Sequence, residues 1–262
     1  MSNAPVCYAL AQAQFNPIAA MTKYVDEVQD RLRREGYTLY EPHHVSQFQF
    51  AATPSQTLAE PQVTQVTNWL ITKGDRSSGF ILTPSSISFH TTHYETSKEF
   101  IPALLGGLKA VHEVVGLDHV ARLGLRYLDA VLPQPDETVD QYLADGLQGM
   151  RFGATQKYGL NESVFETETG PLSAKGTLVA RIFRLTGPLG FPPDMIPNGL
   201  VPQPKFDRKD ILPHAVIDTD HFVEGPMALD FDKLGEQLTS LHQTIRQVFD
   251  KTISRHAEAV WA

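Results

Sequence analysis

The chain has 262 residues, of which 42% are hydrophobic and 20% are charged, proportions typical of globular proteins. No stretch approaches the ~20 consecutive apolar residues of a membrane helix. The formal net charge of −8 disfavours bulk binding to nucleic acid, where neutralised phosphates supply most of the affinity. The N-terminus has no basic segment followed by an apolar run, and a lone cysteine, Cys7, excludes an internal disulfide. We therefore expect a cytoplasmic protein without membrane contacts.

The first part of the chain is predicted to follow the order β-α-β-β-β-α. Alternating apolar residues predict a strand over 6–15, and apolar residues at helical spacing predict an amphipathic helix from Met21 that stops at Gly36. Three further segments have the composition of strands, the last interrupted at Pro84: "TLYEPHHVSQFQFA", "QVTQVTNWLIT" and "GFILTPSSISFHTTHY". The turn "GDRSSG" between the last two predicts a hairpin.

The next segment predicts a helix from Ser97 to Gly116. Gly106 and Gly107 lie in its middle, where each glycine costs about 1 kcal/mol relative to alanine. We expect close packing of this helix against a strand to explain the two glycines.

The same order of elements then restarts. We predict a strand at "HVARLGLRYLDAV", a helix at "TVDQYLADGLQ", strands at "SVFETETG", "GTLVARIFRLTG" and "HAVIDTDHF", and a last helix from Phe231 to Ser254. This order predicts a duplication, with a first half over 1–116 and a similar half over 117–262 that together form one body. The fold class is then α+β, a mainly antiparallel sheet with helices on one face, in an order that resembles TATA-binding-protein-like or helix-grip folds.

A proline-rich segment over 187–213 interrupts the second half. It has no periodicity, and loops of this length in compact domains tend to be functional or disordered. Its apolar residues include Phe191, Met195 and Phe206, which favour a loop that packs against another surface over a free linker. We expect it to fold back on its own domain, and the alternative is that it holds a partner.

The segment "ARLGLRYLDAV" carries two arginines in an apolar run. By alternation Arg122, Gly124 and Arg126 share one face, while Tyr127 lies on the other face, which helices would cover. Gly124 leaves a gap between the two guanidiniums that admits a carboxylate or phosphate. The alternative that we favour is internal pairing with acids on a neighbouring strand, such as the glutamates of 166–168.

Signatures of well-known enzymes are absent: the sequence has no phosphate-binding glycine loop, nucleophile elbow or zinc-protease motif, so we expect no cofactor and no metal. His90 and His93 are three residues apart, which points them to opposite faces of a strand. Asp218 and Asp220 share one face, a spacing compatible with a hard cation or acid–base work. A solvated strand face is the simpler interpretation for the acids.

The last helix has apolar residues at alternating steps of three and four between Phe231 and Val248. A stripe of this width suits a helix laid across a sheet. We therefore expect it to dock on the sheet, with homodimerisation as the alternative.

Two patterns carry a resemblance to a known family. The strand core R-x-G-L-R-Y spans Arg122 to Tyr127, and the helix pattern L-H-x-x-I-x-x-x-F-x-x-x-I spans Leu241 to Ile253. With the hairpin that ends "GFILTPSSISFHTTHYET", they resemble a sporadically distributed bacterial family of uncharacterised proteins, over most of the chain. That family often has Ile-Asn where this sequence has Leu-Asp after the core. The resemblance implies no reaction, and the patchy distribution of the family implies a link to mobile elements or defence.

Two hypotheses about function follow. The first is a non-enzymatic binding protein that holds a protein partner with the sheet face of Arg122 and Arg126 and with the proline-rich loop. The second is a small-molecule or nucleotide-binding protein, or an enzyme of unfamiliar type, in which the same arginines hold an anionic ligand near the acids and histidines named above. Nucleic-acid binding through a duplicated saddle is disfavoured by the acidic charge.

Overall fold

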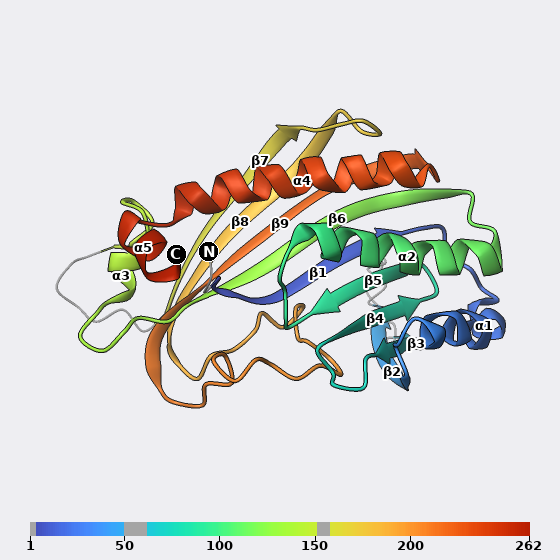
Figure 1. Ribbon diagram of the computed structural model, residues 1–262, viewed down its shortest axis with the longest axis horizontal. Helices are drawn as coiled ribbons and strands as arrows, with labels where there is room; N and C mark the ends of the chain where they lie inside the picture. The colour runs from blue at the N-terminus through green and yellow to red at the C-terminus, as the bar shows by residue number, and fades with distance from the viewer. Residues whose placement is uncertain (1–3, 50–61, 151–157) are drawn as a thin grey trace, which may run out of the picture.

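Figure 1 presents the computed structural model of the chain, which describes residues 4–49, 62–150 and 158–262. These residues form a nine-stranded antiparallel sheet and five helices, and the helices lie on one side of the sheet. The strands are β1 (Val6–Gln14), β2 (Leu39–Gln49), β3 (Gln62–Thr72), β4 (Ser78–Thr83), β5 (Ser86–Thr91), β6 (His119–Val131), β7 (Tyr158–Glu168), β8 (Lys175–Gly187) and β9 (Leu212–Ala228). The helices are α1 (Met21–Arg34), α2 (Ser97–Val115), α3 (Val139–Tyr142), α4 (Phe231–Thr252) and α5 (Arg255–Trp261). The predicted α+β class with helices on one face is confirmed.

The first strands of the two predicted halves, β1 and β6, pair in the interior of the sheet. The strand order is β2-β3-β4-β5-β1-β6-β9-β8-β7, and the central register pairs Leu10 with Arg126 and Gln12 with Gly124. Strands of the first half therefore lie on one side of this pair and strands of the second half on the other. The duplication itself stays a prediction.

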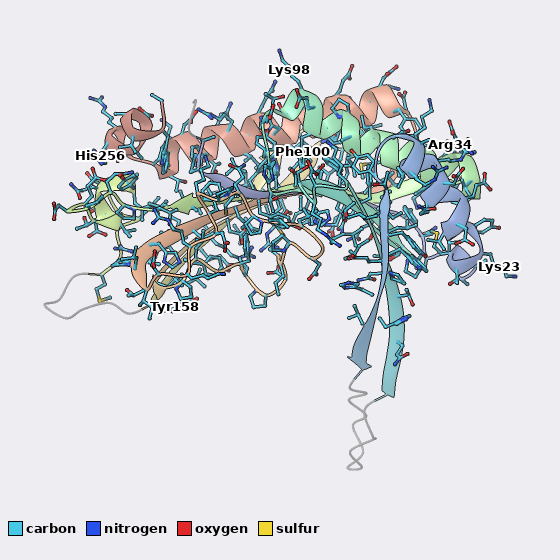
Figure 2. The ribbon with its side chains drawn as sticks, turned by 60° about the horizontal axis from the view of Figure 1, so that its bottom comes forward. Lys23, Arg34, Lys98, Phe100, Tyr158 and His256 are labelled. Carbon is cyan, nitrogen blue, oxygen red and sulfur yellow. The ribbon has the colours of Figure 1, made fainter. Side chains whose placement is uncertain are left out.

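The main core lies between the sheet and the helices α1, α2 and α4 (Figure 2). Leu123, Leu125 and Tyr127 of β6 face this core, as the alternation of the strand predicts. Leu238 and Leu241 of α4 are fully buried in it. The apolar stripe of α4 thus docks on the sheet. In the part of the chain that the structure describes, no helix is long and apolar enough to cross a membrane.

Gly107 explains how closely α2 approaches the sheet. A Cβ atom at this position would lie 2.3 Å from Cε1 of Phe80 on β4, so only glycine fits without displacement. At Gly106 the nearest atom to such a Cβ is Oε2 of Glu35, 4.0 Å away. The expected close packing is confirmed for Gly107 and wrong for Gly106.

The segment around Pro84 forms two strands and not one interrupted strand. β4 and β5 pair antiparallel, with Thr83 opposite Ser86 at the turn. The Thr83 hydroxyl lies 2.8 Å from the Ser86 hydroxyl and accepts a hydrogen bond from the backbone N–H of Ser85 at 3.1 Å. The proline therefore turns the chain back, and the first half has the order β-α-β-β-β-β-α.

Two predicted helices are shorter than their sequences suggest. The helix expected at "TVDQYLADGLQ" is only α3, because Leu143 leaves the helix to form an isolated bridge with Ile253. The backbone N–H of Ser254 also donates to the carbonyl of Tyr142 at 2.9 Å. The same contacts end α4 at Thr252, just before the predicted end at Ser254, and α5 follows as a short helix that the sequence did not predict.

Candidate functional site

Arg126 lies at the centre of an ion-pair cluster on the face of the sheet opposite the helices. Its Nε and Nη2 atoms donate to Oδ1 and Oδ2 of Asp218 on β9, both at 2.7 Å, and its Nη1 donates to Asp194 of the proline-rich loop at 2.5 Å. Asp218 is fully buried and lies 3.5 Å from Nη1 of Arg181 on β8. The favoured interpretation of internal pairing is confirmed, but the acids come from β9 and the loop and not from 166–168.

Arg122 is held more loosely at the next position on this face. Its guanidinium lies 3.6 Å from Asp220 and 3.8 Å from Glu224, and it stacks 4.1 Å from the centre of the Phe222 ring. A Cβ atom on Gly124 would lie 2.9 Å from Cβ of Phe222. The expected gap at Gly124 is therefore wrong, because Phe222 fills the space that would admit a carboxylate or phosphate.

Carboxylates outnumber guanidiniums in this cluster. Burial raises the pKa of Asp220. Burial would also raise the pKa of Asp194, but the hydrogen bond from Arg126 holds it below its ordinary value. An anionic ligand would therefore meet more negative than positive groups. The acids within 4.0 Å of Arg122, Arg126 or Arg181 are Glu162, Asp194, Asp218, Asp220 and Glu224.

The predicted histidines do not join these acids. His90 is fully buried, its Nδ1 lies 2.9 Å from the hydroxyl of Tyr8, and burial lowers its pKa to about 3. His93 is exposed after β5, and its Nδ1 contacts the hydroxyl of the preceding threonine at 3.0 Å. Asp218 and Asp220 do share a face, where arginines flank them. Among the described residues, no three His, Cys, Asp or Glu side chains are grouped to hold a metal ion.

The proline-rich loop over 187–213 folds back on the sheet, as expected. Met195 and Phe206 are buried in a second core cluster on the face opposite the helices, together with Tyr8. Phe191 packs edge-on against Tyr8, with 6.0 Å between the ring centroids. Met195 and Phe206 are thus part of the core and do not form an exposed surface for a partner.

Tyr127, the remaining predicted binding residue, points to the helix-covered face. Its hydroxyl lies 3.3 Å from Nδ1 of His242 on α4, and its ring lies 5.1 Å from that of Tyr94. Two residues further along β6, Asp129 is 4% exposed and lines a cleft of about 290 Å³ with these three side chains. Burial raises the pKa of Asp129 to about 7, although Arg246 opposes this shift. We call this cavity the Asp129 cleft; sequence reasoning missed it, and the acid in an apolar strand was its only signal.

β7 forms the end of the sheet and pairs with β8 alone in the part of the chain that the structure describes. Apolar side chains are exposed on both of its faces, including Tyr158 at 61%, Val164 at 62% and Phe165 at 49%. In Figure 1 the ends of β7 and β8 extend beyond α4, which covers the neighbouring strands. The outer edge of β7 therefore has neither a strand partner nor a helical cover among the described residues.

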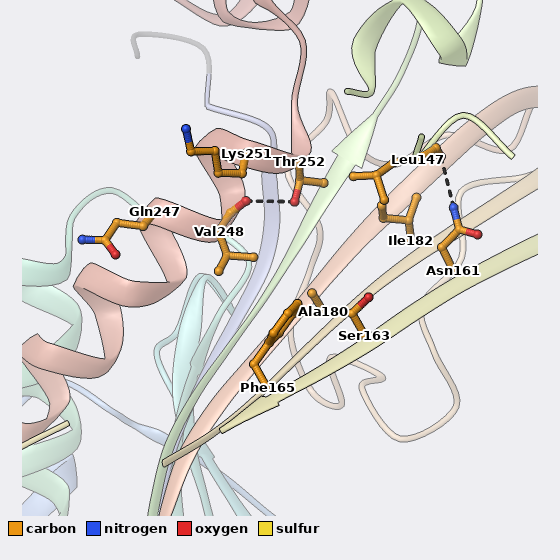
Figure 3. Close-up of a pocket in the computed structure, with 10 residues that line it drawn as sticks. All are labelled: Leu147, Asn161, Ser163, Phe165, Ala180, Ile182, Gln247, Val248, Lys251 and Thr252. Carbon is orange, nitrogen blue, oxygen red and sulfur yellow. Dashed lines mark hydrogen bonds between the residues drawn. The ribbon is translucent and has the colours of Figure 1, made fainter. Parts of the chain in front are cut away.

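A groove of about 540 Å³ lies between β7, β8 and α4 (Figure 3). We call it the β7 groove. Phe165 and Ile182 supply apolar surface, and Asn161 donates a hydrogen bond to the carbonyl of Leu147 at 3.2 Å across one end. The lining residues are Leu147, Asn161, Ser163, Phe165, Ala180, Ile182, Gln247, Val248, Lys251 and Thr252.

The fold and these sites define an α+β protein with a one-sided sheet, an exposed edge strand and two clefts beside α4. No protein-family model, curated protein or solved structure matches the chain. Its function is therefore inferred from the geometry of the sites.

Proposed function

We propose that the protein is a non-enzymatic binding protein that captures an extended segment of a protein partner along β7. The observation that carries this proposal is the outer edge of β7, eleven residues long and largely exposed. Extended peptides add to such edges through backbone hydrogen bonds, while alternate side chains enter neighbouring pockets and give specificity. The kind of partner is the same as in the hypothesis from the sequence, a protein. The proposed binding surface is now the edge of β7 and not the sheet face of Arg122 and Arg126.

The other end of the sheet, formed by β2, is less suited to accept an added strand than β7. Natural proteins protect sheet edges with proline, charge, bulges or a covering segment. β2 contains Pro42, which lacks a backbone N–H and weakens any added strand. β7 contains no proline and instead exposes Val164 and Phe165. The two edges therefore differ in their capacity to accept another strand.

The β7 groove gives the added strand a place for side chains. Ser163 and Phe165 of β7 line it across from Val248 and Thr252 of α4 (Figure 3). An added strand pairs its side chains with those of β7 on each face, at Cβ separations of about 5 Å. Its side chains on the helix face would therefore enter the groove next to Phe165.

The acidic side chains of β7 favour a partner segment that carries basic residues. β7 carries Glu162, Glu166 and Glu168 and has no lysine or arginine. Glu162 and Glu166 pair with Arg181 and Lys175 of β8 but keep exposed carboxylates. A segment with basic residues on this face adds a second partner to these carboxylates, and opposite charges across two strands stabilise the pair. A second copy of β7 would bring glutamates near glutamates, which counts against homodimerisation through this edge.

A designed peptide tests this proposal. The probe is a fluorescent ten-residue peptide in which lysine alternates with valine, and a glutamate–valine peptide of equal length is its control. We expect the lysine peptide to bind, and the substitution Val164→Lys to weaken it at least tenfold by adding like charge and removing apolar contact. Val45→Lys on β2, where Val45 is 41% exposed, is the matched control and should have no effect.

Anisotropy titrations measure all these affinities. Equal binding of the glutamate peptide, or unchanged binding to the Val164→Lys variant, would contradict strand addition at β7. The alternative of an arginine-lined anionic site has less support, because Arg122, Arg126 and Arg181 each have a carboxylate partner.

A further inference from the structure

Asp129 is a buried carboxyl group whose hydrogen-bonding capacity is unused. It is 4% exposed, and within the described residues no group donates a hydrogen bond to its carboxylate, on which Arg246 acts through charge alone. A buried acceptor without a donor costs stability, so such groups in native proteins call for an explanation. Because Asp129 lines the Asp129 cleft, a donor can reach it from outside the protein.

The walls of the Asp129 cleft are aromatic and apolar. Tyr94 and Tyr127 contact each other edge-on at 5.1 Å between centroids, and Ile245 and Phe249 of α4 also line the cleft. The volume of about 290 Å³ lies near the lower end of the ~300–1,000 Å³ that ligand pockets occupy. The cleft therefore suits a compact ligand with an apolar body.

The charges around the cleft favour a cation. Glu95 adds a second carboxylate just before α2, and the guanidinium of Arg246 forms an ion pair with Asp250 at 3.0 Å. Burial lowers the pKa of His242, so this histidine is neutral at pH 7. Within the described residues neither Asp129 nor Glu95 forms an ion pair, although the charge of Arg246 reaches Asp129.

We propose that the Asp129 cleft binds a small organic amine in its ammonium form. The ammonium group donates hydrogen bonds to the Asp129 carboxylate, and the apolar body of the ligand packs against Tyr94 and Tyr127, whose ring faces attract cations. The cleft contacts α4 through His242 and Arg246, whereas the β7 groove contacts it through Gln247 and Lys251. The two sites are therefore separate, and this inference does not depend on partner binding at β7.

Three matched probes test the proposal on the intact protein: phenethylamine, its neutral analogue phenethyl alcohol, and the anion phenylacetate. Isothermal titration at pH 7.5 should detect phenethylamine binding at least tenfold tighter than either analogue. The substitution Asp129→Asn should remove this preference. Asp118→Asn should keep it, because Asp118 directly precedes β6 and its side chain is 96% exposed. Circular dichroism confirms that both variants are folded.

The pH dependence of amine affinity is a second test of the proposal. Amine affinity should rise between pH 6 and 8 as Asp129 ionises. The other charged or titratable groups that face the cleft are Tyr127 on β6, Tyr94 and Glu95 before α2, and His242 and Arg246 on α4. Equal affinity for the alcohol, tighter binding of phenylacetate, or an unchanged amine preference in Asp129→Asn would each overturn the proposal. The comparison of the three probes on the wild-type chain needs no variant.

Discussion

Arg126 and Asp218 form a bidentate ion pair, with both N–O distances at 2.7 Å, that joins β6 to β9 on the face opposite the helices. Asp218 is fully buried and also lies 3.5 Å from the guanidinium of Arg181. The arginine of the R-x-G-L-R-Y core is thus bound to the protein's own carboxylates. Its guanidinium contacts Asp218 of β9 and Asp194 of the proline-rich loop.

Removing this guanidinium should be costly. We expect Arg126→Ala to lower the free energy of unfolding by about 3 kcal/mol, because the loss of one partner leaves a buried charge uncompensated. Urea unfolding measures the change. The exposed pair of Lys175 and Glu166, whose side chains are each 71% exposed, supplies the control: Lys175→Ala should cost less than about 1 kcal/mol. Equal costs at the two positions would contradict the account.

Asp129 should make stability depend on pH. Its pKa rises from 3.8 to about 7 on folding, so the folded state binds more protons than the unfolded state between these values. The contribution of Asp129 to stability is therefore present at pH 4 and is lost as the pH rises to 7, by at most about 4 kcal/mol. Asp129→Asn should match the wild type near pH 4 and be more stable at pH 8. Thermal unfolding at the two pH values checks this, and a variant less stable at pH 8 would refute it.

The two adjacent glycines of α2 should respond in opposite directions. Gly107→Ala forces a methyl group onto the Phe80 ring and should destabilise by about 1–3 kcal/mol through overpacking. Gly106→Ala meets open space and should stabilise by up to about 1 kcal/mol through helix propensity. Denaturant midpoints of the two variants distinguish these effects, and a stabilising Gly107→Ala would show that α2 shifts freely.

The proline-rich loop should behave as part of the core. Phe206 is 5% exposed, and Phe206→Ala should cost about 3 kcal/mol, as expected for truncation of a buried aromatic ring. Ile196 in the same loop is 52% exposed, and Ile196→Ala should change stability by less than about 0.5 kcal/mol. Chemical denaturation compares the two, and similar small effects would mean that the loop contributes little to folding.

The local elements could largely be predicted from the sequence because their patterns are local. Alternation in β6 correctly separated Arg122 and Arg126 from Leu125 and Tyr127, and helical spacing identified α1 and α4. The turn at Pro84 was mistaken for an interruption, since one proline is compatible with either.

The sites could not be predicted because they depend on strand order. The neighbour of β6 is β9, so the partners of Arg126 are Asp218 and a loop acid; nothing in the sequence near Arg126 indicates this. The edge position of β7 and the depth of the Asp129 cleft likewise arise from tertiary packing. Leu143 leaves the predicted helix for the same reason, because it bridges to Ile253 more than a hundred positions away.

Hydrogen–deuterium exchange along β7 tests the central claim of partner capture most directly. The backbone amides of Tyr158–Glu168 should exchange more slowly when the lysine–valine peptide is bound, since outer-edge N–H groups become hydrogen-bonded to the added strand. Protection should extend to the part of α4 that lines the β7 groove and should be absent from β2. Protection centred on Arg122 and Arg126, with β7 unchanged, would contradict strand addition and return the arginine face as the binding surface.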